Sequence, residues 1–222
     1  MAISPTHTNR TADSIIVPDV VVERLPLYVR VLAGFEARGT EMVSSEQLGS
    51  QLHMTPAQIR KDLSYFGRFG KQGRGYNVQA LALRLREILG LDRSWNACLV
   101  GVGRLGRAII SYPGFAPEGF NIVSAFDMNP AVVGTMVDGI SVDAISEIKP
   151  VVERLDIAIG IVAVPAAAAQ EVIDRLVEAG VGGILNYAPV TAHAPGNVKI
   201  KNIDPVMSLQ SMTYYLKTRI QA

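Results

Sequence analysis

Residues 96–106 read NACLVGVGRLG, an apolar run followed directly by a glycine turn. The apolar residues before the first glycine have the length of a short buried strand. Gly101, Gly103 and Gly106 follow the spacing G-x-G-x-x-G, and apolar residues at 108–110 continue as a helix. In a dinucleotide fold the first glycine makes the turn, the second lets a pyrophosphate approach, and the third lets the helix pack on the strand. The stretch therefore predicts the opening of a Rossmann domain.

A carboxylate ends the next apolar segment. Residues 122–126 form a second predicted strand, and Asp127 follows 21 residues after Gly106. A carboxylate at this distance binds the ribose hydroxyls of adenosine and repels the extra phosphate of NADP(H), so the cofactor is expected to be NADH or NAD+. The alternative is a glycine-rich turn with a surface Asp. The expected cofactor contacts are Gly101, Gly103, Arg104, Leu105, Gly106 and Asp127.

Three later segments read as further buried strands of an α/β domain. The predicted strands cover residues 157–164, 183–186 and 198–203, and a helix over 167–178 separates the first two. Alternating strands and helices predict a doubly wound parallel sheet. Ligands of such sheets bind at the carboxyl ends of the strands. The nicotinamide side is therefore expected to be lined by Val164, Pro165, Asn186, Tyr187 and Ala188.

The first third of the chain has the pattern of a helix-turn-helix. Ser44 is followed three residues later by Gln47, and Thr55 is followed by Gln58, with a proline in between. Such pairs are capping boxes, and proline is favoured at the first helical position. The predicted helices cover residues 45–52 and 56–66, joined by a tight turn.

An amphipathic helix precedes this motif. Val21, Leu25 and Tyr28 recur at three- and four-residue steps, and Gly39 ends the pattern. Pro26 lies inside it and is expected either to bend the helix or to begin a second one.

Residues 67–76, GRFGKQGRGY, contain four glycines and three cations. Glycines allow a tight hairpin, and cations at its tip reach a phosphate or the minor groove. Tyr76 and Val78 alternate as the returning strand, a helix over 80–89 closes the domain, and 90–94 is the linker. A helix-turn-helix followed by a basic hairpin is typical of a winged helix.

The second helix of a helix-turn-helix enters the major groove, with its early residues nearest the bases. Gln58 is then placed to pair with adenine, and Arg60 or Lys61 with guanine or a phosphate. The alternative is an ordinary amphipathic helix with a solvated basic face. The candidate contacts with double-stranded DNA are Ser45, Gln58, Arg60, Lys61, Ser64, Tyr65, Lys71, Arg74 and Tyr76.

The distribution of charge supports a polyanionic partner. The net charge of the 222 residues is +1, but residues 1–90 hold 11 Lys and Arg against 8 Asp and Glu. Residues 55–76 hold five cations against Asp62 alone. Such local concentration suits nucleic acid better than a random solvated face.

The sequence also argues against several kinds of site and segment. Cys98 is the single cysteine, so an intrachain disulfide and a cysteine-based metal cluster are ruled out, and we predict no metal site. Cys98 lies in an apolar run and reads as a buried strand residue. The longest apolar run, 157–169, is interrupted by Pro165 and is shorter than the ~20 residues of a membrane span. Residues 1–17 lack an apolar signal-peptide core and read as a flexible arm of a cytoplasmic protein.

The predicted domain order places a terminal helix last. Leu209, Met212, Leu216 and Ile220 form an apolar stripe, which packs either on its own domain or on a partner subunit. The expected parts are the arm 1–17, a winged-helix domain 18–91, a Rossmann domain 92–204 and a terminal helix 205–222, which is a dimerisation helix where the stripe packs on a partner subunit.

Two other functions compete with a DNA-binding regulator. An NAD-dependent dehydrogenase needs a general acid or base near the hydride. His193, in the loop 191–196, is the one histidine expected near the pocket, and it reads as a surface residue. A CoA- or other nucleotide-binding module without a DNA role is disfavoured by the basic hairpin. We therefore predict that the chain is not an enzyme.

Several motifs in order resemble the Rex family of bacterial redox-sensing transcriptional repressors, from about Pro18 to the carboxyl terminus. They are RKDLSYFG at 60–67, GRGY at 73–76, the glycine turn, YPGF at 112–115 and GILNYAPV at 183–190. The resemblance implies a homodimer that binds a palindromic operator when the NADH/NAD+ ratio is low and is released by NADH.

The resemblance also implies how the signal travels. Family members swap the carboxyl-terminal helix, which inserts between the partner's two domains. Arg30, Tyr112 and Asp204 are expected to form the ionic and hydrogen-bonding switch between domains. Family members often carry Phe or Leu after this aspartate, whereas this chain has Pro205.

Overall fold

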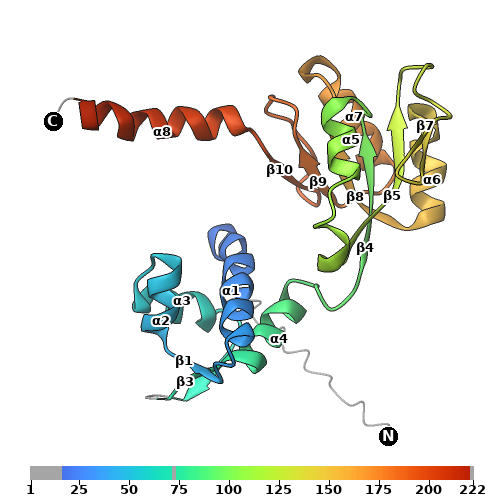
Figure 1. Ribbon diagram of the computed structural model, residues 1–222. Coiled ribbons are helices and arrows are strands. Elements are labelled where there is room, and N and C mark those ends of the chain that lie inside the picture. The colour runs from blue at the N-terminus through green and yellow to red at the C-terminus, as the bar shows by residue number, and fades with distance from the viewer. Residues whose placement is uncertain (1–16, 72–73, 221–222) are drawn as a thin grey trace, which may run out of the picture. The chain divides into compact units, whose positions relative to one another are not determined.

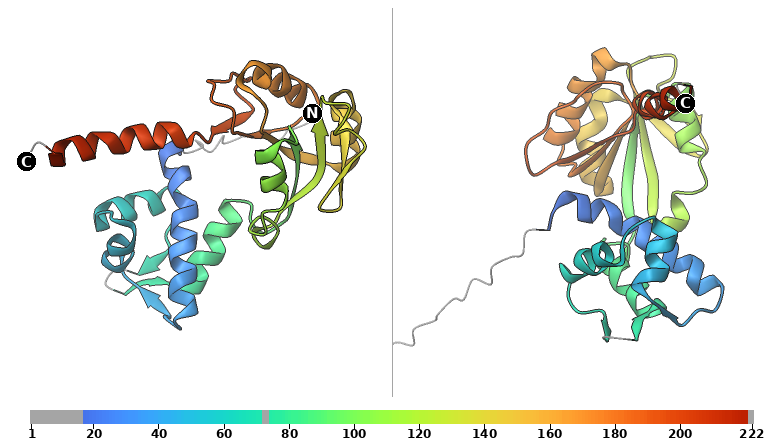
Figure 2. Two further views of the ribbon diagram at one scale, coloured as in Figure 1. Left: turned by 45° about the horizontal axis from the view of Figure 1, so that its top comes forward. Right: turned by 90° about the vertical axis from the view of Figure 1, so that its left-hand side faces the viewer.

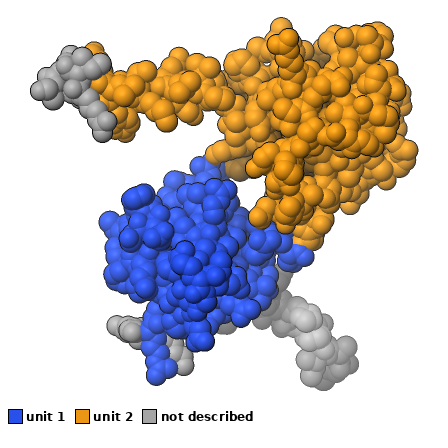
Figure 3. Space-filling model, in the orientation of Figure 1, with its two compact units in different colours: residues 1–92 blue, residues 93–222 orange. Residues whose placement is uncertain are grey.

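The computed structural model describes residues 17–71 and 74–220. The chain divides into two compact units, residues 1–92 and residues 93–222 (Figure 1 and Figure 3). The arm expected over 1–17 lies, except for Val17, outside the described residues. Each unit is described by itself below.

Unit 1 is a winged helix, as the sequence predicts. Asn77 caps its last helix by accepting a hydrogen bond from the Ala80 amide at 2.8 Å, so Val78 begins this helix instead of extending the strand. The expected second helix of the helix-turn-helix also ends two residues early, at Ser64. The elements are α1 (Asp19–Ala37), β1 (Met42–Val43), α2 (Ser45–Leu52), α3 (Pro56–Ser64), β2 (Gly70–Lys71), β3 (Gly75–Asn77) and α4 (Val78–Ile88).

The tight turn between α2 and α3 depends on local chemistry. Ser44 forms the full predicted capping box with Gln47. The Thr55 hydroxyl accepts a hydrogen bond from the backbone N–H of Gln58. His53 ends α2 in the left-handed conformation with φ 54°. A Cβ atom on Gly49 would clash with the Met54 carbonyl oxygen, so glycine lets the chain fold back closely here. The helix-turn-helix therefore depends on the caps at the starts of α2 and α3 and on the close approach of Gly49 to the Met54 carbonyl oxygen.

The proline in α1 does not divide the helix. Val21, Leu25, Tyr28 and Leu32 are buried in the core of unit 1, whereas Pro26 is exposed. The predicted alternative of a second helix starting at Pro26 is therefore wrong, because burial of the opposite face outweighs one lost backbone hydrogen bond. Figure 2 shows α1 (blue) running the length of unit 1, with the small sheet at one end.

The wing is a short antiparallel hairpin. Its three-stranded sheet has the order β1-β3-β2, with Gly70 opposite Tyr76 and Lys71 opposite Gly75. Gly75 has φ +74°, and a Cβ atom there would lie 2.5 Å from the Val43 carbonyl oxygen. This glycine therefore serves both the backbone conformation and the contact with β1.

Unit 2 is built on a seven-stranded sheet of order β10-β9-β8-β4-β5-β7-β6. Strand pairings are parallel except the antiparallel β6–β7 hairpin at one edge. Beyond the predicted elements, the sequence analysis missed β6, β7 and α6. The elements are β4 (Trp95–Val100), α5 (Arg104–Ile110), β5 (Phe120–Asp127), β6 (Met136–Val137), β7 (Ile140–Ala144), α6 (Ile148–Leu155), β8 (Ile157–Val162), α7 (Ala166–Glu178), β9 (Gly183–Asn186), β10 (Lys199–Asn202) and α8 (Pro205–Ile220).

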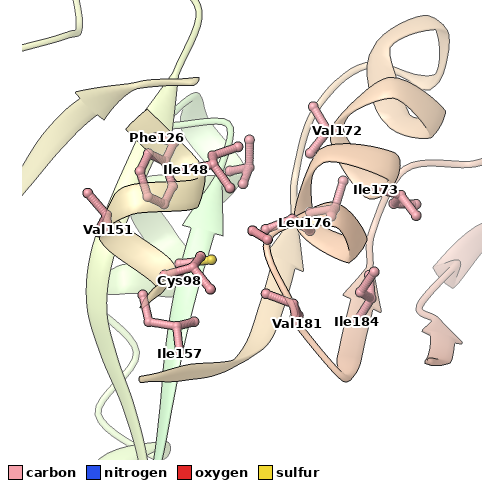
Figure 4. Close-up of a cluster of buried hydrophobic side chains, with 14 of the residues drawn as sticks. Cys98, Phe126, Ile148, Val151, Ile157, Val172, Ile173, Leu176, Val181 and Ile184 are labelled. Carbon is pink, nitrogen blue, oxygen red and sulfur yellow. The ribbon is translucent and has the colours of Figure 1, made fainter. Parts of the chain in front are cut away.

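Alternate residues of β4 enter two cores, one on each face of the sheet. Cys98 and Val100 pack with α6 and α7, and Ala97 and Leu99 pack with Ile109 of α5. This is the doubly wound arrangement that the sequence predicts. Figure 4 shows Cys98 between the side chains of the first core. Burial raises the pKa of the Cys98 thiol to about 12, which confirms an inert buried strand residue.

The terminal helix α8 presents its apolar side chains to solvent within this chain. Every residue from Pro205 to Lys217 is exposed, including Leu209, Met212 and Leu216 of the predicted stripe. The described part of unit 2 therefore does not bury the stripe. Among the helices of residues 17–71 and 74–220, none has the length and apolar character needed to cross a membrane.

Candidate functional site in each unit

The helix α3 has an inward and an outward face, as a recognition helix requires. Ile59 and Leu63 are fully or almost fully buried in the core of unit 1. Arg60, Lys61 and Ser64 are exposed, and the Ser64 hydroxyl donates to the Lys61 carbonyl oxygen at 2.7 Å. The helix therefore offers a polar, basic face to a partner. Of the other expected DNA contacts, Gln58, Tyr65 and Tyr76 are half-buried, and Arg74 is exposed.

Ser45 has a hydrogen-bonding role that the sequence analysis did not predict. It begins α2 and is 8% exposed, and its hydroxyl accepts a hydrogen bond from Arg60 Nη1 at 2.9 Å. Arg60 also lies 3.9 Å from the Glu46 carboxylate. This hydroxyl therefore holds the guanidinium of Arg60. Ser45 also lines the groove beside α3, and its contact with DNA stays a prediction.

A groove of about 750 Å³ joins the start of α2, the outer side of α3 and the wing. Arg60, Arg68 and Arg74 contribute its cations, and Glu46 is its acidic residue. The side chain of Lys71 lies outside the described residues. Three cations around a groove between a helix and a hairpin suit the backbone of a nucleic acid.

The sequence analysis missed a carboxylate cluster behind α3, formed by Arg24, Tyr28, Gln58 and Asp62. Arg24 Nε and Nη2 each donate to one oxygen of Asp62 at 2.7 Å. The Tyr28 hydroxyl donates to Oδ2 at 2.9 Å, and Gln58 Nε2 donates to Oδ1 at 2.8 Å. Asp62 is 0% exposed, so the single acid of the basic segment 55–76 is the most buried polar residue of α3.

The charge of this cluster is held by its hydrogen bonds. Burial by itself raises the pKa of Asp62, but hydrogen bonds from Arg24, Gln58 and Tyr28 outweigh burial and hold that pKa below its ordinary value. Burial and the adjacent carboxylate raise the pKa of Tyr28. Asp62 is therefore ionised and Tyr28 protonated at neutral pH. The available sequence signal was the i, i+4 spacing of Gln58 and Asp62.

In unit 2 the three glycines of the turn differ in what surrounds each of them. Gly101 has φ +100°, and a Cβ atom there would lie 2.5 Å from the Ala163 carbonyl oxygen. A Cβ atom on Gly106 would clash with the Gly101 carbonyl oxygen, so this glycine lets α5 pack closely on β4. Gly103, in contrast, has open space where its Cβ atom would be. That space fits a pyrophosphate group approaching the backbone.

Asp127 lies at the end of β5, beside the glycine turn. Its Oδ2 accepts from the Val102 amide at 2.7 Å, and its Oδ1 accepts from the Asn129 amide at 2.8 Å. A carboxylate has about four lone-pair sites, so both oxygens keep capacity for ribose hydroxyls. The residue is half-buried. Its position therefore fits an adenosine ribose, while Arg104 and Leu105 lie exposed at the start of α5.

Asn186 plays a structural part at the carboxyl end of β9. It is fully buried, accepts from the Ala188 amide at 3.0 Å, and donates to Asn202 Oδ1 at 2.9 Å and to the Ala188 carbonyl oxygen at 3.1 Å. This side chain therefore holds the turn after β9, and its contact with the cofactor stays a prediction. Tyr187 and Val164 are half-buried, Pro165 is exposed, and Ala188 is 4% exposed.

The three expected switch residues are distributed over both units. Arg30 is exposed on α1 of unit 1. Tyr112 of unit 2 is 58% exposed, and its ring packs edge-on against Phe115 with 5.1 Å between centroids. Asp204 Oδ1 accepts from the Val206 amide at 2.8 Å and so caps α8. Their mutual contacts stay a prediction.

His193 is exposed, and its described hydrogen bonds join its backbone N–H and carbonyl to the Gln170 side chain. Within residues 17–71 and 74–220, groups of three or more His, Cys, Asp or Glu side chains able to hold a metal ion are absent.

Two family models match the chain, one in each unit. A model described as "Putative DNA-binding protein N-terminus" matches residues 16–64, and one described as "CoA binding domain" matches residues 92–190.

Relatives match nearly the whole chain. It is 51% identical to the redox-sensing transcriptional repressor Rex of Roseiflexus sp. (strain RS-1) over 205 residues, 92% of this chain and 93% of that relative. It is 41% identical to the repressor of the same name from Desulfitobacterium hafniense over 91% of this chain and 97% of that relative. The crystal structure of RSP in complex with beta-NAD+ and operator DNA is 37% identical, with a TM-score of 0.87 over 93% of this chain and 95% of that chain. RSP in complex with beta-NADH has a TM-score of 0.83 at 35% identity, over 93% of this chain and 97% of that chain.

Proposed function

The chain belongs to the Rex family of redox-sensing transcriptional repressors, and from this premise we propose that it binds operator DNA through unit 1 and NAD(H) through unit 2. One observation carries the proposal: a basic helix-turn-helix with a wing and a glycine turn with Asp127 at the ribose position occur in the same chain. The related RSP is seen with both kinds of ligand.

The DNA interface is the outer side of α3 together with the groove toward the wing. The start of α3 enters the major groove, where Gln58 reads a base. Arg60, held by Ser45, and Lys61 contact guanine or phosphates, and Arg74 of the wing reaches the DNA backbone or minor groove. Ser64, Tyr65, Lys71 and Tyr76 complete this interface.

NAD(H) binding uses the turn after β4 and the ends of β5, β8 and β9. Gly103 leaves room for the pyrophosphate, and Asp127 accepts hydrogen bonds from the adenosine ribose. The carboxylate disfavours NADP(H) and favours a dinucleotide over CoA. Val164, Pro165, Tyr187 and Ala188 lie toward the nicotinamide, whose ring is positively charged in NAD+ and neutral in NADH.

The same premise decides against the dehydrogenase alternative, because the family acts as transcriptional repressors and not as enzymes. His193 fits this conclusion, since it is an exposed loop residue tied through its backbone to Gln170.

The proposed switch uses the charge difference between the two nicotinamide states. In the DNA-binding state Asp204 pairs with Arg30, and in the NADH-bound state Asp204 turns toward Tyr112. The recognition helices then lose their half-site spacing. A ligand shifts such an equilibrium only by its differential affinity, and a swing from 1:99 to 99:1 needs about 5.5 kcal/mol.

The repressor acts as a homodimer in the cytoplasm, where its operator is found. The exposed apolar side chains of α8, among them Leu209, Met212 and Leu216, support a helix that is buried by a partner subunit. A two-fold dimer presents two recognition helices to a palindromic site.

A DNA-binding titration tests the proposal. The full chain is added to a palindromic, AT-rich duplex at fixed salt, because phosphate contacts make affinity strongly salt-dependent. NAD+ and NADH are then added in separate series. We expect micromolar NADH to release the duplex and NAD+ to leave it bound. Absence of DNA binding, or release by both nucleotides equally, contradicts the proposed function.

A further inference from the structure

We propose that Asp62 is a specificity-determining positioning residue, which holds the side-chain amide of Gln58 in the orientation that reads an adenine of the operator. The inference rests on the proposed function, because it assigns the origin of base specificity within the same DNA interface. It concerns a residue that cannot touch DNA itself, since Asp62 is 0% exposed.

The orientation follows from the chemistry of the two groups. An ionised carboxylate only accepts hydrogen bonds, whereas a glutamine amide has an accepting oxygen and two donating N–H groups. Gln58 Nε2 lies 2.8 Å from Asp62 Oδ1. A flipped amide would place Oε1 against Oδ1, where two acceptors repel each other. The carboxylate therefore selects one of the two amide orientations.

This orientation leaves the reading edge of the amide free. Bidentate recognition of adenine uses the amide oxygen as acceptor and one N–H as donor. The second N–H is not needed by the base and is the one that Asp62 can accept. Gln58 is half-buried at the third position of α3, and its backbone N–H donates to Thr55 Oγ1. Both the backbone and the amide of Gln58 are thus fixed before DNA arrives.

The carboxylate is itself held by residues of another helix. Arg24 of α1 binds both oxygens of Asp62 at 2.7 Å, and Tyr28 of α1 binds Oδ2. A bidentate guanidinium fixes the plane of a carboxylate as well as its charge. Because Gln58 uses Oδ1 and Tyr28 uses Oδ2, the two hydrogen bonds can be removed separately.

The experiment measures base preference and total affinity in parallel. The full chain selects from a pool of palindromic duplexes with randomised half-sites, and the bound duplexes are sequenced. Gln58→Ala should lose discrimination at one A·T pair per half-site, by about 5- to 150-fold, with little change at other positions. Asp62→Ala should lose the same preference at the same pair, and the double variant should lose no more than Gln58→Ala alone.

Two further variants separate positioning from folding. Tyr28→Phe keeps the Gln58–Asp62 hydrogen bond and should leave the base preference unchanged while it lowers stability. Arg24→Met with Asp62→Ala removes both charges, so that no unpaired guanidinium remains if Asp62→Ala fails to fold. This double variant should show the same loss of preference. Circular dichroism and thermal unfolding verify that each protein used is folded.

Two results overturn the inference while the proposed function stands. One is a Gln58→Ala protein with unchanged preference at every position. The other is a folded Asp62 variant that keeps the Gln58-dependent preference or loses affinity equally for all sequences. A wild-type chain that selects no duplex contradicts the proposed function itself.

Discussion

The two units hold their functional segments in opposite ways. In unit 1 the helix α3 is tied to α1 by an ion pair between the partly exposed Arg24 and the buried Asp62, which accepts four hydrogen bonds from three side chains. In unit 2 the turn after β4 is shaped by glycines, and the turn after β9 is held by the neutral side chain of Asn186. Because Arg24 and Asp62 are charged, we expect the stability of unit 1 to depend on pH and to fall when either side chain is removed. Because Gly101 and Gly106 lie against backbone oxygens, we expect the stability of unit 2 to fall when a side chain is added at either position.

The largest expected effect comes from breaking the ion pair of unit 1. Asp62→Ala leaves the guanidinium of Arg24, which is 21% exposed, without its carboxylate. Removing one partner of a buried pair costs about 3 kcal/mol, at the lower end of the usual range because Arg24 reaches solvent. Hydrogen exchange of α1 and α3 measures the free energy of unfolding of unit 1. Arg84→Ala, which breaks an exposed pair with Glu87, is the matched control and should change it little.

A pair of glycine variants tests unit 2. Gly106→Ala forces a Cβ atom against the Gly101 carbonyl oxygen and should destabilise unit 2 by about 2 kcal/mol. Gly103→Ala meets open space, with φ −74° at this residue, so unit 2 should keep its stability. Its methyl group would occupy the pyrophosphate position, and NADH affinity should fall by about tenfold or more.

These two variants are compared by urea unfolding and by NADH titration. Trp95 is the single tryptophan and lies in unit 2, so its fluorescence reports this unit. Equal stability losses in the two variants would show that the three glycines do not have separate roles.

Removing the Asn186 side chain should lower the free energy of unfolding of unit 2 by less than removing the Asp62 side chain lowers that of unit 1. Asn186→Ala leaves the buried Ala188 amide without its acceptor and should cost about 2 kcal/mol. Asn202→Ala removes one hydrogen bond from the Asn186 side chain and is expected to cost about 1 kcal/mol. Trp95 fluorescence in urea gives both values. A larger loss for Asn202→Ala would contradict the role assigned to Asn186.

The smallest effect is a difference in pH dependence between the units. The folded-state pKa of Asp62 lies below its ordinary value of 3.8, so its stabilisation is present above that pH and is lost as pH falls through the folded pKa. Asn186 does not titrate. Hydrogen exchange of α3 between pH 7 and pH 3 should show a loss of stability that Asp62→Ala removes. If the stability of α3 falls equally with pH in the wild type and in Asp62→Ala, Asp62 is not the source of the pH dependence.

Much of the fold, and part of each candidate site, could be predicted because the signals lie between residues that are close together in the chain. The capping box at Ser44, the cap at Thr55 and the glycine turn from Gly101 involve residues within a few positions of each other. The β6–β7 hairpin was missed because short edge strands have weak apolar patterns. The helix α6 was missed although Ile148, Val151 and Val152 recur at helical spacing and are buried. Of the two outcomes predicted for Pro26, a second helix is wrong, because α1 continues through the proline with its opposite face buried.

The sequence by itself predicted the two-domain organisation, the order of the main strands and helices, and the candidate residues of both sites. It did so because caps, glycine spacing and apolar periodicity act between near neighbours in the chain. Only the tertiary structure decided that Asp62 is buried, that Ser45 lies beneath Arg60 and that Asn186 faces inward. Arg24 and Asp62 are 38 residues apart, and Arg60 and Ser45 are 15 apart. Such pairings depend on how helices and strands pack, and packing free energy is shared by many residues and is not encoded in any one segment.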